Sequence, residues 1–226
     1  MFDFTFIPVI KGELLDDYLA KGWFRVGSMI HTADSTSIDD GEEYPVYWLR
    51  YKVDAVMLRR KNKKLISANS AFTIYSRPLA LNHETELLFK KYRKGIRFTI
   101  NGTLESILSD TTNDTFDSRI IEVRDNGRLI AAGIFDIGKT SVENIINFYD
   151  HAYAKYSLGK LLIISIHQYC RKHGLEYYYP GYYIPGQQVL SYKLFLDKRA
   201  TEVYLPEQST WVCYYEFEKQ IAHLLT

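Results

Sequence analysis

The sequence predicts an α/β fold in which a meander of three strands leads into one buried helix and a further strand. Two segments with strand periodicity, RIIEVR and LIAAGIFDIG, flank the turn D-N-G-R, and Asn-Gly tolerates the positive φ angles of a tight hairpin. SVENIINFY follows as the third strand. Residues 157–173 are apolar around most of a helix that ends in Arg171, Lys172 and Gly174, so we expect this helix to be central and buried. EYYYPGYYI then supplies the next strand.

The segments on either side of this unit predict shorter elements and a division into two lobes. We expect a basic N-terminal lobe over residues 1–80 and a core over residues 81–226. Pro78 is expected at an edge or a bend. The remaining expected elements are, in chain order, a helix over residues 13–20, an extended WFRVGSMIHT, a long strand YPVYWLRYKVDAVM, a helix over residues 59–67, an extended AFTIYSRPLAL, an amphipathic helix over residues 83–92, a helix TLESILS capped by Thr103, a helix VLSYKLFL, and a final strand pair made of EVYL and TWVCYYEF.

Positive charge is concentrated in one segment, although the chain of 226 residues has a formal net charge of only +1. Residues 50–97 contain 13 Lys or Arg but only three acidic residues, and the densest pieces are RRKNKK and KKYRKGIR. Such a block can hold a polyanion through counterion release. It can equally form a solvated helix face, and the sequence leaves both interpretations open.

The sequence contains no sign of a membrane span, a secretion signal or a metal site. No apolar run approaches the ~18 residues that a membrane span needs. MFDFTFIPVIKGE lacks a basic segment followed by an apolar one. Cys170 and Cys213 are far apart and do not have the spacing of metal ligands. We therefore expect a reduced, cytoplasmic protein that does not enter a membrane.

The order F-Y-D, S-L-G, Y-Y-x-G-Y-Y-I and Y-K within residues 147–193 resembles the C-terminal domain of arginyl-tRNA–protein transferases. These enzymes and their bacterial leucyl-transferring relatives move an amino acid from tRNA to a protein N-terminus. Near the N-terminus, GWFRVG and YPVYWLRYKV followed by RRKNKK are similar to further elements of the family. The resemblance implies a GNAT-like acyltransferase core, a mixed and largely antiparallel sheet around one buried helix, with a smaller N-terminal lobe.

The sequence departs from the family pattern at several informative places. The family places metal-binding or cluster-binding cysteines where this chain has SMIHTADSTSIDDGEE, and a lone His31 cannot hold a metal, so we expect no metal, iron–sulfur cluster or other cofactor. His151 replaces a proline. The resemblance implies that basic residues of the family read an acidic acceptor residue; this chain replaces them, so either the acceptor differs or the transfer is lost. The positions concerned are Gln188, Val189, Phe195 and Asp197.

The resemblance also assigns candidate site residues. Asp150 is expected to hold an ammonium or accept a proton, with a helix cap as the alternative. A helix is expected to start at Ser157, and the backbone amides of its first residues, including Leu158 and Gly159, suit a phosphate. The expected catalytic residues are Asp150, Tyr182, Tyr192 and Lys193; the other substrate contacts are Ser157, Leu158, Gly159, Tyr178, Gly181 and Tyr183; the tRNA contacts are Arg25, Arg59, Arg60, Lys61, Lys63 and Lys64.

The expected function is aminoacyl transfer from aminoacyl-tRNA to the N-terminal α-amine of a protein or peptide, as in protein arginylation and the N-degron (N-end rule) pathway. Two alternatives stay open. An acyl-CoA-dependent N-acyltransferase would place a pyrophosphate at Gly159, although YAKYSLGK supplies one glycine where such enzymes have a glycine-rich loop. A catalytically silent module that binds tRNA or peptide is the other alternative.

Overall fold

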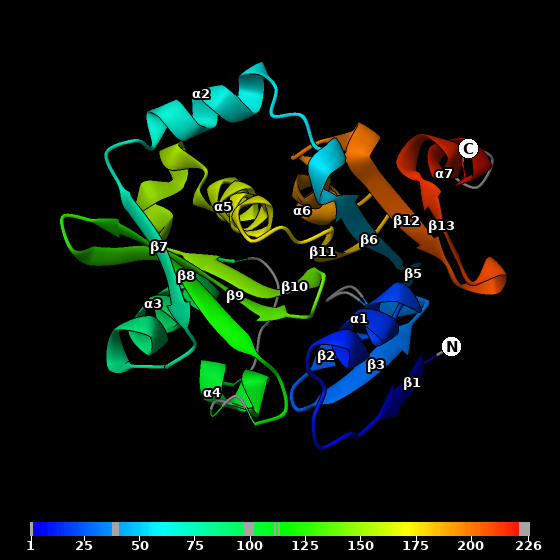
Figure 1. Cartoon of the computed structure of the whole chain (residues 1–226). Helices are drawn as coiled ribbons and strands as arrows, with labels where there is room; N and C mark the ends of the chain where they lie inside the picture. Colours follow the sequence, from blue (N-terminus) through cyan, green and yellow to red (C-terminus); the bar gives the residue numbers. More distant parts are fainter. Residues whose placement is uncertain (1, 38–40, 97–101, 111, 113, 222–226) are drawn as a thin grey trace.

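A single eight-stranded sheet organises the structure, a computed structural model that describes residues 2–37, 41–96, 102–110, 112 and 114–221 (Figure 1). Its strand order is β13-β12-β6-β11-β10-β9-β8-β7, and every neighbouring pair is antiparallel except β10 and β11. The strands are β6 (Tyr47–Lys52), β7 (Thr73–Pro78), β8 (Ser118–Asp125), β9 (Arg128–Ile137), β10 (Ser141–Tyr149), β11 (Tyr177–Tyr183), β12 (Thr201–Leu205) and β13 (Thr210–Cys213).

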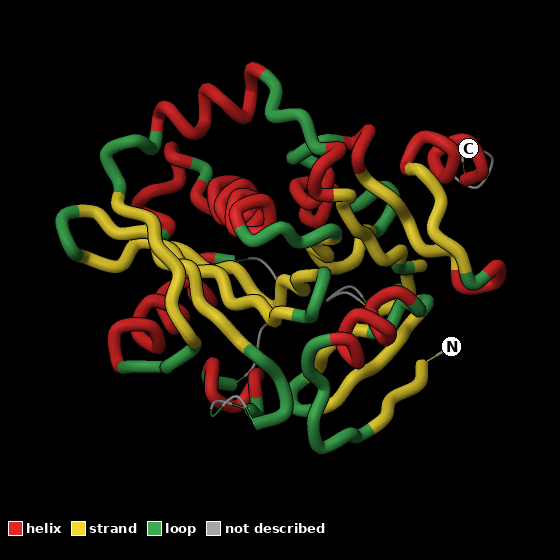
Figure 2. Tube along the Cα trace, viewed as in Figure 1, coloured by secondary structure: helices red, strands yellow, loops and turns green. Residues whose placement is uncertain are grey.

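Helices cover both faces of this sheet (Figures 1 and 2). The central helix α5 (Leu158–Lys172) packs on one face, and α2 (Arg60–Ala68) lies outside it. On the other face, α3 (His83–Gly95) and α4 (Leu104–Leu108) enclose a second apolar cluster. The short helix α6 (Gln188–Ser191) follows β11, and α7 (Tyr214–Ile221) packs beside β12. In the described residues no helix is long and apolar enough to cross a membrane.

The N-terminal residues form a small sheet of their own and also contribute to the large one. β1 (Phe2–Thr5), β2 (Phe24–Val26) and β3 (Met29–Ala33) pair in the order β1-β3-β2 beside α1 (Glu13–Ala20). The pair β4 (Ser35–Ser37) and β5 (Glu43–Pro45) follows. Since β6 and β7 precede residue 80 yet belong to the large sheet, the segments on either side of that residue share one sheet.

The predicted meander, buried helix and following strand are all confirmed. β8 and β9 meet at a turn in which Asn126 and Gly127 have φ angles of 46° and 85°. α5 ends at Lys172, and Gly174 follows with φ 67°, as the glycine after a helix C-terminus commonly does. α5 is apolar around most of its circumference because it lies between the sheet and α2.

Two expected strands are wrong in their extent. YPVYWLRYKVDAVM is a strand only to Lys52 and then forms a 3₁₀ turn over Val53–Ala55. TWVCYYEF is a strand only to Cys213, because Tyr214, Phe217 and Ile221 share one side of α7 and bury it beside β12. The alternation of apolar and polar residues in Y-Y-E-F does not distinguish one helical turn from a short strand.

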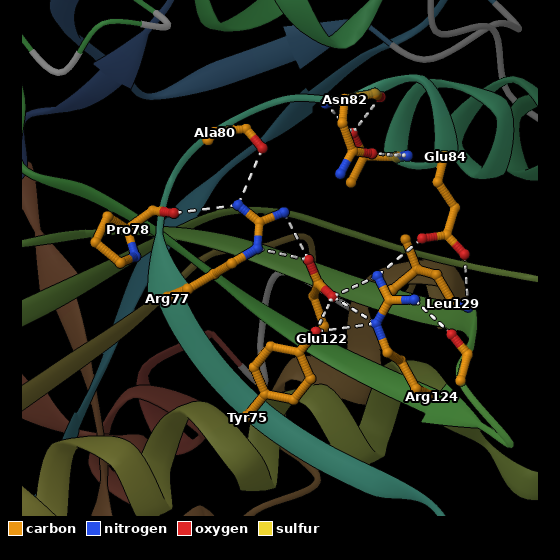
Figure 3. A network of polar contacts seen from close by, with 11 residues as sticks. Tyr75, Arg77, Pro78, Ala80, Asn82, Glu84, Glu122, Arg124 and Leu129 are labelled. Carbon is orange, nitrogen blue, oxygen red and sulfur yellow. Dashed lines mark hydrogen bonds and ion pairs between the residues drawn. The ribbon is translucent and has the colours of Figure 1, made fainter.

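A polar network fixes the edge strand β7 to its neighbour and to α3 (Figure 3). Glu122 is fully buried on β8, and its carboxylate accepts hydrogen bonds from Tyr75, Arg77 and Arg124. Arg124 also pairs with Glu84 at 2.8 Å, and Glu84 accepts the backbone N–H of Leu129. The carboxylate of Glu122 has all its hydrogen-bond partners within the fold, so we infer that this network stabilises the structure and does not bind a ligand.

A second buried network ties the N-terminal sheet to the core through Arg25. Its guanidinium pairs with Asp136 at 2.9 Å, donates to Ser118 and Leu108, and has a side-chain exposure of 1%. The backbone N–H of Arg25 donates to Glu143 at 2.8 Å. Burial, and then the nearby Asp136 carboxylate, raise the pKa of Glu143 to about 8, so this carboxyl keeps its proton at neutral pH. Arg25 was expected to contact tRNA, and in the structure its guanidinium is buried and already paired within the fold.

We expect Arg25→Met to lower the free energy of unfolding by about 3–5 kcal/mol, because it leaves the Asp136 charge buried without a partner. Urea denaturation measures this loss. Arg60→Met, which removes an exposed arginine of α2, is the matched control and should change stability by no more than about 0.5 kcal/mol. If the Arg25→Met protein is as stable as wild type but binds tRNA more weakly, the structural role of Arg25 is wrong and Arg25 contacts tRNA.

Candidate functional site at the start of helix α5

The site forms where the only parallel strand pair of the large sheet comes apart. β10 and β11 pair over just three residues each, Ser141–Glu143 with Tyr177–Tyr179. Beyond this point β10 follows β9, whereas β11 follows β6, and each strand has an irregularity in register near the divergence. The helix that crosses between two parallel strands returns along them, so the start of α5 lies at the diverging end.

A cavity of about 490 Å³ opens at this end of the sheet. Its walls come from the last residues of α3 and β10, from the start of α5, and from the segment after β11. Within the described part of the chain, none of the lining residues is Asp or Glu. The lining residues are Tyr92, Gly95, Ile96, Asn147, Tyr149, His151, Ala154, Ser157, Gly159, Lys160, Leu190 and Tyr192.

The cavity lining is mainly apolar, with three tyrosines, and contains a few polar atoms. The Oδ1 atom of Asn147 is buried and accepts no hydrogen bond from the described residues. Burial, and then the neighbouring Tyr149 and Tyr182, raise the pKa of Tyr192 to about 12, so its phenol stays neutral and can donate a hydrogen bond. His151 stacks on Tyr92 with an angle of 2° between the two rings.

Helix α5 begins here without a side-chain cap. Ser157 adopts a left-handed conformation, with φ 51°, and its carbonyl oxygen accepts the amides of Lys160 and Leu161. No acidic residue lies in the first turn. Gly159 packs closely on Tyr149, because a Cβ atom there would lie 3.2 Å from the Tyr149 ring. Amides in the first turn of a helix lack partners within the helix, so this end suits an anion.

Lys193 lies beside the cavity, next to Gly181 and Tyr182. Its ammonium is 4.7 Å from the centre of the Tyr182 ring, and a Cβ atom on Gly181 would come within 2.7 Å of it. The Lys193 carbonyl oxygen accepts a hydrogen bond from the buried hydroxyl of Tyr51. Burial lowers the pKa of Lys193 to about 8. No ion pair to this ammonium occurs among the described residues, so a sizeable fraction of Lys193 is neutral near pH 8.

Asp150 faces α3 and acts as a cap. Its Oδ1 accepts the N–H of Ala152 at 2.9 Å, and its Oδ2 pairs with Lys91 at 2.7 Å and with Arg128 at 3.0 Å. Burial would raise its pKa, but the hydrogen bonds from Lys91 and Ala152 outweigh this effect and hold the pKa below its usual value. A carboxylate in this state is a poor proton acceptor. Neither Asp150 nor Lys193 is among the residues that line the cavity, so they do not share it as expected.

The other predicted residues separate into three environments. Ser157, Gly159 and Tyr192 line the cavity. Leu158 and Tyr178 are buried in the core under α5, and Tyr183 points toward α7, with its ring 6.2 Å from that of Tyr214. The expected tRNA contacts of α2 are all exposed; they are Arg59, Arg60, Lys61, Lys63 and Lys64.

Several cavity residues were missed by sequence reasoning. Asn147 and Tyr149 could have been found, because strand alternation places them on one face of β10 and Phe148 and Asp150 on the other. Lys160 directly follows the S-L-G element and could have been included with it. Tyr92 carries no comparable signal, since it looks like any apolar residue of an amphipathic helix.

The parallel pair, the buried crossover helix and the cavity at its start define a GNAT-like acyltransferase fold, as the sequence predicted. The crystal structure of FemX has the same general fold, with a TM-score of 0.55 at 10% identity over 92% of this chain and 70% of that one. The family model for the C terminus of arginine-tRNA-protein transferase matches residues 83–200. The protein therefore belongs to the arginine-tRNA-protein transferase family.

Curated relatives support the same assignment. The chain is 24% identical over 223 residues to the aspartate/glutamate leucyltransferase of Leptospira interrogans, covering 96% of this chain and 85% of that protein. It is 27% identical over 183 residues to the aspartate/glutamate leucyltransferase of Helicobacter hepaticus, covering 77% and 73%.

We expect Asp150→Asn to lower the free energy of unfolding by about 1 kcal/mol at pH 7, through loss of two ion pairs with exposed partners, while the asparagine amide oxygen keeps the cap on Ala152. Because the folded-state pKa is depressed, this stability is present above the unfolded pKa of about 3.9 and is lost as the pH falls through the folded value. Urea denaturation at pH 7 and pH 3 measures the difference. Asp17→Asn, at an exposed carboxylate of α1, should be neutral; an equally neutral Asp150→Asn would contradict the assignment.

Proposed function

We propose that the protein transfers leucine, or an amino acid of similar apolar character, from aminoacyl-tRNA to the N-terminal α-amine of an acceptor protein. The aromatic cavity at the start of α5, whose lining includes Leu190 but no acidic residue among the described ones, carries this proposal. An arginine side chain would need a carboxylate partner, which this lining does not offer. The relatives from Leptospira interrogans and Helicobacter hepaticus are named as leucyltransferases, which supports the same choice.

The proposed reaction replaces an ester by an amide. The acceptor amine attacks the ester carbonyl, a C–N bond forms, the C–O bond to the terminal ribose breaks, and the ribose hydroxyl leaves with a proton. Since the ester is already activated, the protein has to orient the two substrates and stabilise the oxyanion. We propose that it does so without a metal or another cofactor.

We assign this chemistry to three side chains. The neutral phenol of Tyr192 can donate to the ester oxygen inside the cavity. Asn147 also lines the cavity, and we assign its side-chain amide to hold the ammonium of the carried amino acid, the role first expected of Asp150. Lys193, with a pKa of about 8, can take the proton that the attacking amine releases.

The biological setting follows from these substrates. Charged tRNA and new protein N-termini meet in the cytoplasm, where a transferred residue would act as an N-degron signal. The relatives are named for Asp and Glu acceptors. At one of the positions where the family has a basic residue, this chain has Asp197. Its buried carboxylate accepts the N–H groups of Met57 and Arg199, and it offers no positive charge to an acidic acceptor.

We expect the purified protein to transfer leucine from Leu-tRNA to peptides and to accept Arg-tRNA poorly, because the cavity lacks a carboxylate. A peptide panel with Asp, Glu and uncharged first residues, analysed by mass spectrometry, measures the transfer and the acceptor preference. Activity should survive EDTA. Transfer from acetyl-CoA but not from charged tRNA would identify an acyl-CoA enzyme, and tRNA binding with no transfer would identify a silent binding module.

We expect Lys193→Met to lower kcat by about 10²–10⁴-fold, the usual contribution of a general base, with little loss of thermal stability. Lys193→Arg should be similarly slow, because arginine stays protonated. Turnover at saturating peptide, together with a melting curve, measures both effects. Lys198→Met, at an exposed lysine five residues further along the chain, is the control. A kcat within about twofold of wild type for both Lys193 variants would assign another base.

A further inference from the structure

Helix α2 is held across the start of α5 by two buried asparagines. The side chain of Asn62, in the first turn, donates to the carbonyl oxygen of Leu196 at 3.3 Å. The side chain of Asn69, just beyond the last turn, donates to the carbonyl oxygen of Tyr156 at 3.1 Å. Leu196 lies in the segment between β11 and β12, and Tyr156 ends the 3₁₀ turn just before α5, so α2 is anchored to both of these segments.

The outer face of α2 is basic over residues 60–64, its first half. Asn62, Leu65, Ile66 and Asn69 turn inward, which leaves the basic residues exposed. The helix RKNKKLISA contains no acidic residue. In the described structure, no ion pair involves the four exposed cations of this helix, which are Arg60, Lys61, Lys63 and Lys64.

One aromatic ring brings this basic face into contact with the cavity. The ammonium of Lys61 on α2 lies 4.8 Å from the centre of the Phe195 ring. The ammonium of Lys160, in the first turn of α5, lies 5.0 Å from the same centre, and Lys160 lines the cavity. Phe195 attracts both cations through its π face. The two ammonium groups repel one another, and no described carboxylate pairs with either, so a bound anion would stabilise both.

We propose that Lys61 and Lys160, positioned by Phe195, hold a backbone phosphodiester of the single-stranded 3′ end of tRNA at the mouth of the cavity. This inference rests on the proposed function, because the terminal nucleoside with its amino acid would occupy the cavity itself. Arg60, Lys63 and Lys64 continue the positive surface away from the mouth and would follow the nucleic acid toward its acceptor stem.

A phosphodiester fits these observations better than the carboxylate of an acidic acceptor peptide does. A single carboxylate would be satisfied by one cation, whereas this surface offers Lys160 at the cavity and four exposed cations within residues 60–64 of α2. Several phosphates can match such a cluster, and their binding releases counterions from each contact.

The test uses two RNA minihelices that carry no amino acid. One has a single-stranded 3′ end, and the other has a blunt end. We expect Lys61→Met and Lys160→Met each to weaken binding of the first RNA about 5–10-fold, and to reduce the slope of log affinity against log salt by about 0.7, as loss of one single-strand phosphate contact should. Lys160→Met should leave binding of the blunt-ended minihelix unchanged. Phe195→Leu keeps an apolar side chain but removes the ring, so it should weaken binding of the first RNA by a smaller factor.

Lys172→Met, which removes an exposed lysine from the last turn of α5, is the matched control and should bind both RNAs as wild type does. If Lys160→Met binds the minihelix with the single-stranded end with wild-type affinity and salt slope, the phosphate site is wrong. Leucyl transfer measured with the wild-type protein would still support the proposed function. A raised KM for peptides with an acidic first residue, with unchanged RNA binding, would overturn the phosphate site in favour of an acceptor site. A wild-type protein that neither binds the minihelices nor transfers leucine would reject the proposed function, and this inference with it.

Discussion

The parallel pairing of β10 with β11 is the constraint on which the site depends. Parallel neighbours cannot be joined by a short turn, so the chain must cross over the sheet, and α5 makes this crossing. The pair holds together for only three residues before each strand follows its other neighbour. A cavity at the start of α5 results from these two facts together, because the crossover begins at the end where the sheet has opened.

Strand alternation then decides which side chains reach that cavity. On β10, Phe148 packs against Phe89 of α3, and Asp150, just after the strand, pairs with Lys91 of the same helix. Asn147 and Tyr149 turn toward α5 and line the cavity. A shift of one residue would exchange these sets. The motif F-Y-D therefore marks the correct strand end, while its phenylalanine and aspartate contact α3 and only its tyrosine, Tyr149, lines the cavity.

Local sequence features were sufficient to predict the elements, and long-range packing explains what they missed. The Asn-Gly turn, the Thr103 cap and the apolar circumference of α5 each act within a few residues, and all were confirmed. Arg25 is different, because its partner Asp136 lies 111 positions away and nothing in GWFRVG shows that the guanidinium is buried. The cavity likewise needs Tyr92 and His151 to stack across 59 positions, a pairing that periodicity cannot reveal.

The charges of the molecule are divided in a way that bears on its substrate. The buried carboxylates of Glu122, Asp136 and Asp150 are each neutralised by arginine or lysine within the fold, and Glu143 keeps its proton. The cations of α2 and Lys160 have no such partners in the described structure, and the cavity that they border has no acidic lining. A ligand that complements both regions must carry repeated negative charge and end in an apolar group. Leucyl-tRNA combines these two properties in one molecule, whereas arginyl-tRNA would bring a second cation into a cavity already bordered by lysine.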